Sequence, residues 1–302
     1  MKADIKAINV KLTCNGDCRG CESYFDCTLP LKQDAVFFDI TEKIKERLSR
    51  VKHKIISVGG KGGVGKTLVT ANLATALAMM GKKVAVLDQV FDGPCIPRML
   101  GVEGKGMTLS ADGLKPTENE MGIKVVSMGL ILDSDEVVTW FHEMKRNATE
   151  ELLYQVDYGE LDYLIIDVPA GTSSDTVNAL QLIPDMDGGT VVTVPSRVSQ
   201  AVAFKAITLL KKADLRVFGV FENMATFVCP TCGNNEHLFQ EGGGKDLAKR
   251  TGTPFIGSIP VDEIVAECSD EGDPVVHRYP DSEAARIFMK AAKRIDNIVG
   301  GN

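Results

Sequence analysis

The chain has 302 residues, of which 44% are hydrophobic and 25% are charged, and its formal net charge is −7. This length allows one large or two small domains with an extensive buried core. The acidic balance argues against nonspecific binding to nucleic acid. No apolar run reaches the roughly 18 residues of a membrane span, and the first residues form no apolar signal core. We therefore expect a cytoplasmic protein with neither nucleic acid nor a membrane as its partner.

The first part of the chain, residues 1–34, is polar and dense in cysteine. It holds four of the eight cysteines of the chain: Cys14, Cys18, Cys21 and Cys27. In a reducing compartment, clustered cysteines indicate a metal site rather than disulfides. Four cysteines this close together can close on one iron–sulfur cluster or one zinc ion within a single chain. Residues 1–34 are therefore predicted to be a separate metal-binding segment.

The rest of the chain is predicted to alternate strands and helices. Residues 35–53 form a connecting segment with an amphipathic helix over 35–51, and residues 54–302 form the main domain. The expected strands are 54–58, 83–87, 163–167, 190–194, 217–222 and 255–258. The expected helices are 66–80, 148–156, 173–182, 199–212, 243–251, 262–268 and 281–298. Apolar strands that alternate with helices are typical of a doubly wound α/β fold with a mostly parallel sheet.

A phosphate-binding loop follows the first strand of this domain. The octet that matches the P-loop pattern G-x-x-x-x-G-K-[ST] is Gly60, Lys61, Gly62, Gly63, Val64, Gly65, Lys66 and Thr67. Glycines let backbone N–H groups close on phosphate oxygens, and the N-terminus of the next helix, near Leu68, adds its dipole. We predict that these residues bind ATP, with Lys66 on the β- and γ-phosphates and the Thr67 hydroxyl on Mg²⁺.

A second lysine inside the loop, Lys61, distinguishes this loop from those of most P-loop proteins. A plain P-loop needs one lysine, and a second cannot easily reach the same phosphates from its own subunit. The loop resembles the deviant Walker A motif of the MinD/ParA/nitrogenase-reductase group, where this lysine reaches the nucleotide of the partner subunit in an ATP-sandwich dimer. The resemblance therefore implies a P-loop NTPase fold and a dimer that binds MgATP.

Asp88 ends an apolar strand, where a carboxylate lies beside the phosphate site in such sheets. It resembles the aspartate of the group that holds Mg²⁺ through water. The group usually reads Asp-x-Asp, and its second aspartate helps to orient the attacking water, but this chain has Val90 at that position. Because Val90 can neither bind water nor accept a proton, we expect slow ATP hydrolysis, with ATP acting mainly as a binding switch.

Two further strand ends complete the predicted nucleotide site. Asp167 and Gly171 resemble a Walker B/switch II element, in which the aspartate acts on Mg²⁺ and the glycine N–H on the γ-phosphate. Asn223 resembles the asparagine that hydrogen-bonds adenine in this group. The predicted catalytic residues are Lys61, Lys66, Asp88 and Asp167.

Cys229 and Cys232 form a C-x-x-C pair, which places two thiolates on one metal. One pair is half of a four-ligand site, and two pairs facing each other in a two-fold dimer would complete it. The local sequence also fits a zinc knuckle, for which His237 is a further candidate ligand. From these residues alone, iron–sulfur and zinc both remain open.

The wider sequence resembles the Mrp/Nbp-type P-loop ATPases, which are cytoplasmic carriers and scaffolds of iron–sulfur clusters. The similarity spans roughly residues 54–280 and rests on the segments 93–101, 167–172, 223–233 and 239–244. It implies that Cys229 and Cys232 bridge a labile 4Fe–4S cluster across the dimer. The N-terminal cysteines resemble an extension of the eukaryotic-type branch that holds a tighter 4Fe–4S cluster, although the first gap between them is shorter here.

These observations predict a dimeric MgATP-binding carrier that assembles 4Fe–4S clusters or transfers them to apo iron–sulfur proteins. The dimer would be a homodimer or a heterodimer with a paralogue. Departures from the family pattern near the expected dimer face, such as Cys95 in place of serine, suggest a specialised subgroup. Two alternatives are an ATP-dependent electron donor like the nitrogenase iron protein and a MinD/ParA-like ATP switch with structural zinc.

Overall fold

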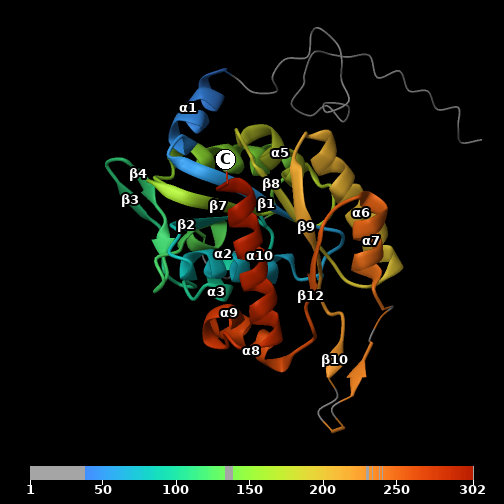
Figure 1. The fold of residues 1–302 in the computed structure, drawn as a ribbon. Helices are drawn as coiled ribbons and strands as arrows, with labels where there is room; N and C mark the ends of the chain where they lie inside the picture. The colour runs from blue at the N-terminus through green and yellow to red at the C-terminus, as the bar shows by residue number, and fades with distance from the viewer. Residues whose placement is uncertain are drawn as a thin grey trace, which may run out of the picture.

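The computed structural model describes residues 38–132, 139–228, 231–232, 234–237, 239 and 241–301. The cysteine-rich segment 1–34 and Cys229 lie outside these ranges. Within them, a mostly parallel sheet has helices on both faces (Figure 1), which confirms the predicted doubly wound α/β fold.

The central sheet has eight strands in the order β12-β9-β8-β1-β7-β2-β6-β5. Their bounds are β1 (Val51–Gly59), β2 (Val84–Asp88), β5 (Thr117–Glu118), β6 (Lys124–Ser127), β7 (Leu161–Asp167), β8 (Gly188–Thr193), β9 (Arg216–Glu222) and β12 (Phe255–Ser258). Neighbouring strands pair in parallel, apart from the short edge strand β5, which runs antiparallel to β6. The carboxyl ends of β1, β2 and β7 therefore meet at one edge of the sheet, where ligands bind in open α/β sheets.

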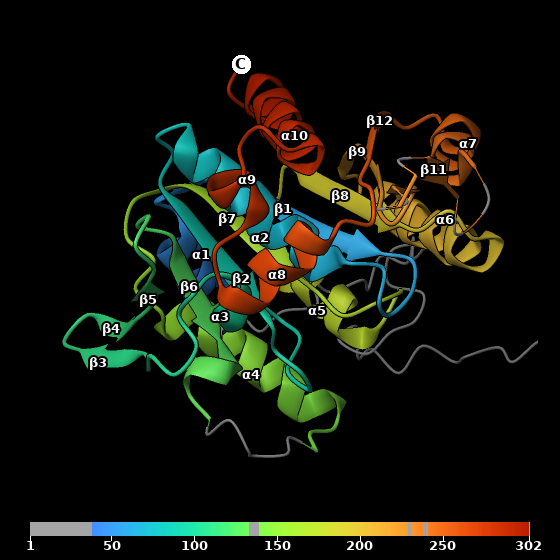
Figure 2. The same cartoon turned by 90° about the horizontal axis from the view of Figure 1, so that it is seen from below.

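Two layers of helices bury the two faces of the sheet. One hydrophobic core lies under α2 (Lys66–Met79), α3 (Ile96–Met99), α8 (Glu263–Glu271), α9 (Val275–Arg278) and α10 (Glu283–Val299). The other lies under α1 (Phe38–Leu48), α4 (His142–Gln155), α5 (Ser174–Leu182), α6 (Arg197–Lys212) and α7 (Gly243–Thr251). Figure 2 shows α10 on one side of the sheet and α4 and α5 on the other.

The last helix, α10, packs its apolar side into the first core. Phe288 and Ile295 are fully buried there, and the helix crosses in front of the sheet in Figure 1. None of the helices in the described ranges combines the length and the apolar character needed to cross a bilayer. The apolar side of α10 therefore packs into the hydrophobic core of the domain.

The predicted strands and helices of the main domain correspond to observed elements, with several differences. The predicted helix over 35–51 extends too far, because Val51 already pairs with Leu161 in the sheet and α1 ends at Leu48. The predicted helix over 148–156 begins earlier, at His142. The sequence analysis missed β5, β6 and the hairpin of β3 (Thr108–Ser110) and β4 (Gly113–Lys115), all of which are short.

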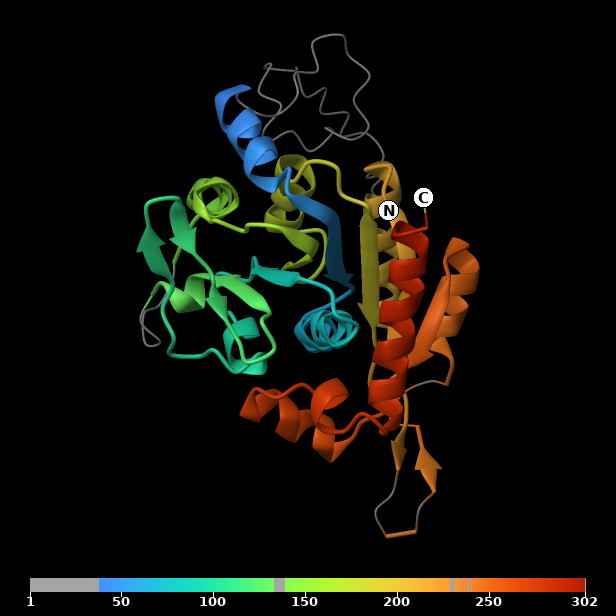
Figure 3. The same cartoon turned by 60° about the vertical axis from the view of Figure 1, so that its left-hand side comes forward.

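A second hairpin projects from the body of the domain between β9 and α7 (Figures 1 and 3). Its strands are β10 (Phe227–Val228) and β11 (Asn235–Glu236), and the turn between them carries Cys232. Glu222 fixes the base of this region, because its buried carboxylate accepts hydrogen bonds from the Gly244 N–H at 2.6 Å and the Ser258 hydroxyl at 2.9 Å. The hairpin is therefore mounted on a rigid junction of β9, β12 and α7.

Candidate nucleotide and metal site

The P-loop connects β1 to α2, as predicted, and wraps over the carboxyl end of β1. Gly63 and Gly65 adopt left-handed conformations with φ of 78° and 87°, which glycine tolerates best. Gly60 touches α6, since a Cβ there would lie 2.4 Å from the Ser199 carbonyl oxygen and 2.7 Å from the Ala203 nitrogen. By contrast, nothing lies within 4 Å of a Cβ at Gly62 or Gly63, so this side of the loop is open to a ligand.

Asn223 supports the loop from below. Its Nδ2 donates a hydrogen bond to the Val64 carbonyl oxygen at 3.0 Å, and its side chain is buried. A Cβ at Gly65 would lie 2.2 Å from the same Nδ2. Asn223, predicted as an adenine contact, therefore holds the P-loop in the structure, and this contact between β9 and the loop was missed in the sequence.

The two loop lysines lie in different environments. Lys66 is buried, and its aliphatic stem packs on Gly59, where a Cβ would lie 2.4 Å from both Cγ and Cδ. Lys61 is exposed and has no ion pair within the part of the chain that the structure describes. One lysine is thus held inside its own site and the other is accessible to another molecule.

Asp167, at the end of β7, joins the sheet to the first turns of α2. Its carboxylate accepts hydrogen bonds from the Thr67 hydroxyl at 2.7 Å and from the Thr70 hydroxyl at 2.9 Å. Thr70 was missed in the sequence analysis, although its position one turn after Thr67 places it on the same side of the helix. Burial raises the pKa of Asp167, and the nearby Lys66 ammonium opposes the rise.

Asp88 lies directly beside Asp167, because the two residues are register partners on β2 and β7. Its carboxylate accepts hydrogen bonds from the Val90 N–H at 3.0 Å and from the Ser127 hydroxyl at 3.2 Å. Burial, followed by the proximity of Asp167, raises the pKa of Asp88 to about 8. Ser127 was also missed, since it belongs to the unpredicted strand β6.

This pair of carboxylates fits a divalent cation. Burial raises the pKa of both carboxyl groups, and repulsion from the Asp167 carboxylate adds to the rise at Asp88. A cation held near them would remove that repulsion, and the neighbouring Thr67 hydroxyl supplies the hard oxygen that Mg²⁺ prefers. The residues that would hold Mg²⁺ are thus Thr67, Asp88 and Asp167.

Two loops frame the open side of the site. Gly171 adopts a φ of 79°, and its N–H donates to the Gly59 carbonyl oxygen at 2.9 Å, so the loop after β7 rests on the end of β1. After β2, Asp92 is exposed, and its carboxylate pairs with the Lys145 ammonium at 2.5 Å. Neither Val90 nor the lysine-paired Asp92 offers a free carboxylate to position water.

Cys232, the described residue of the cysteine pair, lies on the β10–β11 hairpin, which follows the carboxyl end of β9. Cys232 is exposed and free, and His237 is exposed, with its Nδ1 at 3.3 Å from the Ala225 carbonyl oxygen. Within the described ranges, no group of three potential ligands gathers to hold a metal ion. The predicted ligands Cys14, Cys18, Cys21, Cys27 and Cys229 lie outside those ranges.

Comparison with known proteins agrees with this geometry. A family model described as "ParA: NUBPL iron-transfer P-loop NTPase" matches residues 50–296. The chain belongs to this family. An "Iron-sulfur cluster carrier protein" of Methanocaldococcus jannaschii is 42% identical over 293 residues, covering 95% of this chain and 98% of that protein. One of the same name from Saccharolobus solfataricus is 40% identical over 261 residues, covering 86% and 88%.

Solved structures show the same fold. A nucleotide-binding protein from Archaeoglobus fulgidus in complex with ADP has a TM-score of 0.72 and 37% identity, and the match covers 82% of this chain and 96% of that one. The cell division ATPase MinD of Pyrococcus furiosus has a TM-score of 0.61 and 27% identity, covering 82% and 100%. The resemblance to Mrp/Nbp-type and MinD/ParA-like ATPases found in the sequence is confirmed.

The close approach of Gly65 to Asn223 predicts that Gly65→Ala strongly weakens nucleotide binding. The methyl group would displace the Asn223 amide and with it the loop, whereas backbone strain alone costs about 1–2 kcal/mol. Gly81→Ala is the matched control, because Gly81 has a similar φ of 80° but no atom within 4 Å of its Cβ position. Titration with a fluorescent ATP analogue should show wild-type affinity for Gly81→Ala and at least about a tenfold loss for Gly65→Ala. Equal affinities would contradict the proposed contact.

The raised pKa of Asp88 predicts a stability that falls with pH in protein free of nucleotide and metal. The folded Asp88 carboxyl, with a pKa of about 8, keeps its proton up to about pH 8, whereas in the unfolded chain it loses the proton near its ordinary pKa of 3.8. The stabilisation is full below the lower value and is lost as pH rises through the higher one. Asp88→Asn should therefore gain stability over wild type by up to about 1.4 kcal/mol per pH unit between about pH 5 and pH 8. Urea unfolding in EDTA would measure the difference, and a difference independent of pH would refute it.

Proposed function

We propose that the chain is a dimeric MgATP-binding carrier that assembles 4Fe–4S clusters and delivers them to apo iron–sulfur proteins. The main support is that one chain combines a complete P-loop site with an exposed cysteine on a projecting hairpin, in a family described as iron-transfer NTPases. Relatives about 40% identical to it are named iron–sulfur cluster carrier proteins.

The nucleotide is proposed to bind at the carboxyl edge of the sheet. Backbone N–H groups of residues 60–67 and the Lys66 ammonium bind the phosphates, and Asn223 keeps the loop in shape. When bound, Mg²⁺ neutralises charge on the phosphates, and Thr67, Asp88 and Asp167 are the residues that would hold it. The exposed position of Lys61 suits a contact with the nucleotide of a second subunit. The nucleotide-binding protein from Archaeoglobus fulgidus, which has the same fold, was solved in complex with ADP.

Hydrolysis is proposed to be slow, so that ATP acts as a switch between dimer states. Val90 carries no group that orients water, and the carboxylate of Asp92 is paired with Lys145. The remaining strand-end carboxylates, Asp88 and Asp167, are fully buried and accept hydrogen bonds from their own neighbours. Binding energy of the nucleotide is therefore available for dimer closure rather than for rapid turnover.

The cluster is proposed to bind at the β10–β11 hairpin. Cys229 and Cys232 of two subunits would together supply four thiolates to one 4Fe–4S cluster as cargo. Such a cluster is labile, because opening the dimer removes half of its ligands. The exposure of Cys232 suits a ligand set that is shared between subunits. Cys14, Cys18, Cys21 and Cys27 are proposed to hold a second, tighter cluster within each chain.

The packing of α10 favours this function over a membrane-associated ATP switch of the MinD kind. A switch of that kind needs an amphipathic helix whose apolar side is free to enter the lipid surface. In this chain the apolar residues of α10, such as Phe288 and Ile295, are buried against the sheet and α2. Freeing them would expose part of the hydrophobic core.

Anaerobically purified or reconstituted protein is predicted to hold about four irons and four sulfides per chain from the N-terminal cluster and about two of each from the bridging one. The Cys229→Ala/Cys232→Ala variant should lose only the smaller, labile part. Iron and sulfide analysis, together with the broad absorption near roughly 400 nm, would measure both. Cys268→Ala is the control, because Cys268 is buried in the core and 1% exposed.

Two results would contradict the proposal. A colourless protein that contains zinc and resists reconstitution would leave an ATP switch with structural metal. A cluster that cycles between redox states but stays fully bound in the presence of apo-aconitase would indicate an electron donor instead of a carrier.

A further inference from the structure

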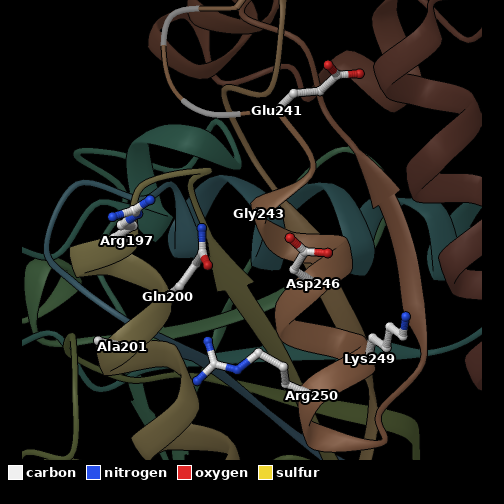
Figure 4. Close-up of a pocket in the computed structure, with 8 residues that line it drawn as sticks. All are labelled: Arg197, Gln200, Ala201, Glu241, Gly243, Asp246, Lys249 and Arg250. Carbon is white, nitrogen blue, oxygen red and sulfur yellow. The ribbon is translucent and has the colours of Figure 1, made fainter.

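A groove of about 1050 Å³ lies between α6 and α7, on the face of the sheet that also carries α4 and α5 (Figure 4). Its α6 wall carries Arg197, Gln200 and Ala201, which share one side of the helix by their spacing of three and four residues. Its α7 wall carries charged residues of both signs and begins at Gly243, in the first turn of that helix. The nucleotide and metal residues described above do not line this groove.

Gln200 contributes to the groove an amide without a hydrogen-bond partner in the described ranges. Its side chain is 8% exposed and has no hydrogen-bond partner among the residues that the structure describes. The amide points into the space between the helices (Figure 4), and its Nε2 lies so close to Gly243 that a Cβ there would be 2.1 Å away. Solvent reaches this amide from the groove, so it is available to hydrogen-bond a ligand that enters between the two helices.

The charges of the groove define the ligand further. Arg197 and Arg250 are exposed and have no ion pair in the described ranges, and the Arg250 guanidinium stacks on Phe204 at 5.6 Å from the ring centroid. The α6 wall holds no carboxylate, whereas Glu241 and Asp246 line the opposite side. Those two carboxylates disfavour a polyanion such as nucleic acid. Because the Arg250 guanidinium stacks on Phe204 of α6, it is reached from the α6 side of the groove. An acidic side chain of a peptide segment bound there can pair with both arginines and accept a hydrogen bond from the Gln200 amide.

The position of the groove connects it to both halves of the proposed function. On one side, α6 packs against the P-loop, because Ser199 and Ala203 touch Gly60. On the other side, α7 directly follows the hairpin that carries Cys232. A segment bound between α6 and α7 therefore lies next to the cysteine hairpin and in contact with a helix that touches the nucleotide loop.

We propose that this groove docks the apo-protein that receives the cluster, through a peptide segment bearing an acidic side chain that binds Arg197, Arg250 and the Gln200 amide. The identity of the partner as a cluster acceptor rests on the proposed carrier function. The preference for an acidic peptide does not, because it follows from the charges and the open amide alone.

The test uses the full-length protein and two labelled peptides, one in which glutamates alternate with leucine and alanine and one with lysine in place of each glutamate. Fluorescence anisotropy should show binding of the glutamate peptide and at least about a tenfold preference over the lysine peptide. Arg197→Glu/Arg250→Glu should weaken binding of the glutamate peptide by at least about tenfold. Gln200→Leu, which changes no charge, should weaken it by about threefold or more.

Lys290→Glu/Lys293→Glu on α10 is the matched control, because it makes the same change in net charge at exposed lysines on the other side of the sheet. It should leave the affinity within about twofold of wild type. Equal binding of the two peptides, or equal affinity in the Arg197→Glu/Arg250→Glu variant, would overturn the proposal. A changed oligomeric state in that variant with unchanged peptide affinity would also overturn it, since the groove would then join two copies of the chain.

A failure of the proposed carrier function and a failure of the proposed docking role give different experimental results. Wild-type protein that transfers no cluster to apo-aconitase would refute the carrier function, while the peptide measurement would still decide whether the groove binds an acidic segment. If wild type does transfer its cluster, the Arg197→Glu/Arg250→Glu variant with normal iron content should transfer more slowly at low acceptor concentration. An unchanged rate at every acceptor concentration would overturn the docking role.

Discussion

The site depends on one buried interaction, in which the Asp167 carboxylate accepts the hydroxyls of Thr67 and Thr70 while lying beside Asp88. The hydrogen bonds fix the end of β7 to the first turns of α2, so the P-loop between β1 and α2 has little freedom. Burial, followed by the neighbouring Asp167 carboxylate, makes the charged form of Asp88 costly without a cation and raises its pKa to about 8. Mg²⁺ bound with a nucleotide would relieve that cost, and we therefore expect the two carboxylates to favour the liganded state.

The same loop is the start of a packed path toward the cysteine hairpin. A Cβ at Gly60 would lie 2.4 Å from the Ser199 carbonyl oxygen of α6, and one at Gly243 would lie 2.1 Å from Gln200 Nε2, so the P-loop contacts α6 and α6 contacts the first turn of α7. Glu222 then ties the first turn of α7 to β9 and β12, at the base of the hairpin. Because each contact is close, a shift of α6 on nucleotide binding would reach α7 and the hairpin. This path is the physical route through which we propose that ATP controls a cluster bound at the hairpin.

Local patterns in the sequence predicted the P-loop, the strand-end aspartates and the long buried strands, because each depends on residues close together in the chain. The edge strand β5 and its neighbour β6 were missed since they are short and carry no strong alternation, and Ser127 was missed with them. The support of the loop by Asn223 depends on strand order, which brings β9 beneath a loop 159 residues away. The roles of the cysteines remain predictions, because most of them lie outside the described residues.

The central claim is that the nucleotide controls how firmly the cluster is held. The most direct test is the rate of cluster transfer from the reconstituted protein to apo-aconitase, measured with and without MgATP for wild type and for Lys66→Ala. The account predicts at least about a tenfold change in the rate on adding MgATP to wild type and no change for Lys66→Ala with the same iron content. Equal wild-type rates with and without MgATP, at concentrations that saturate the nucleotide site, would contradict it.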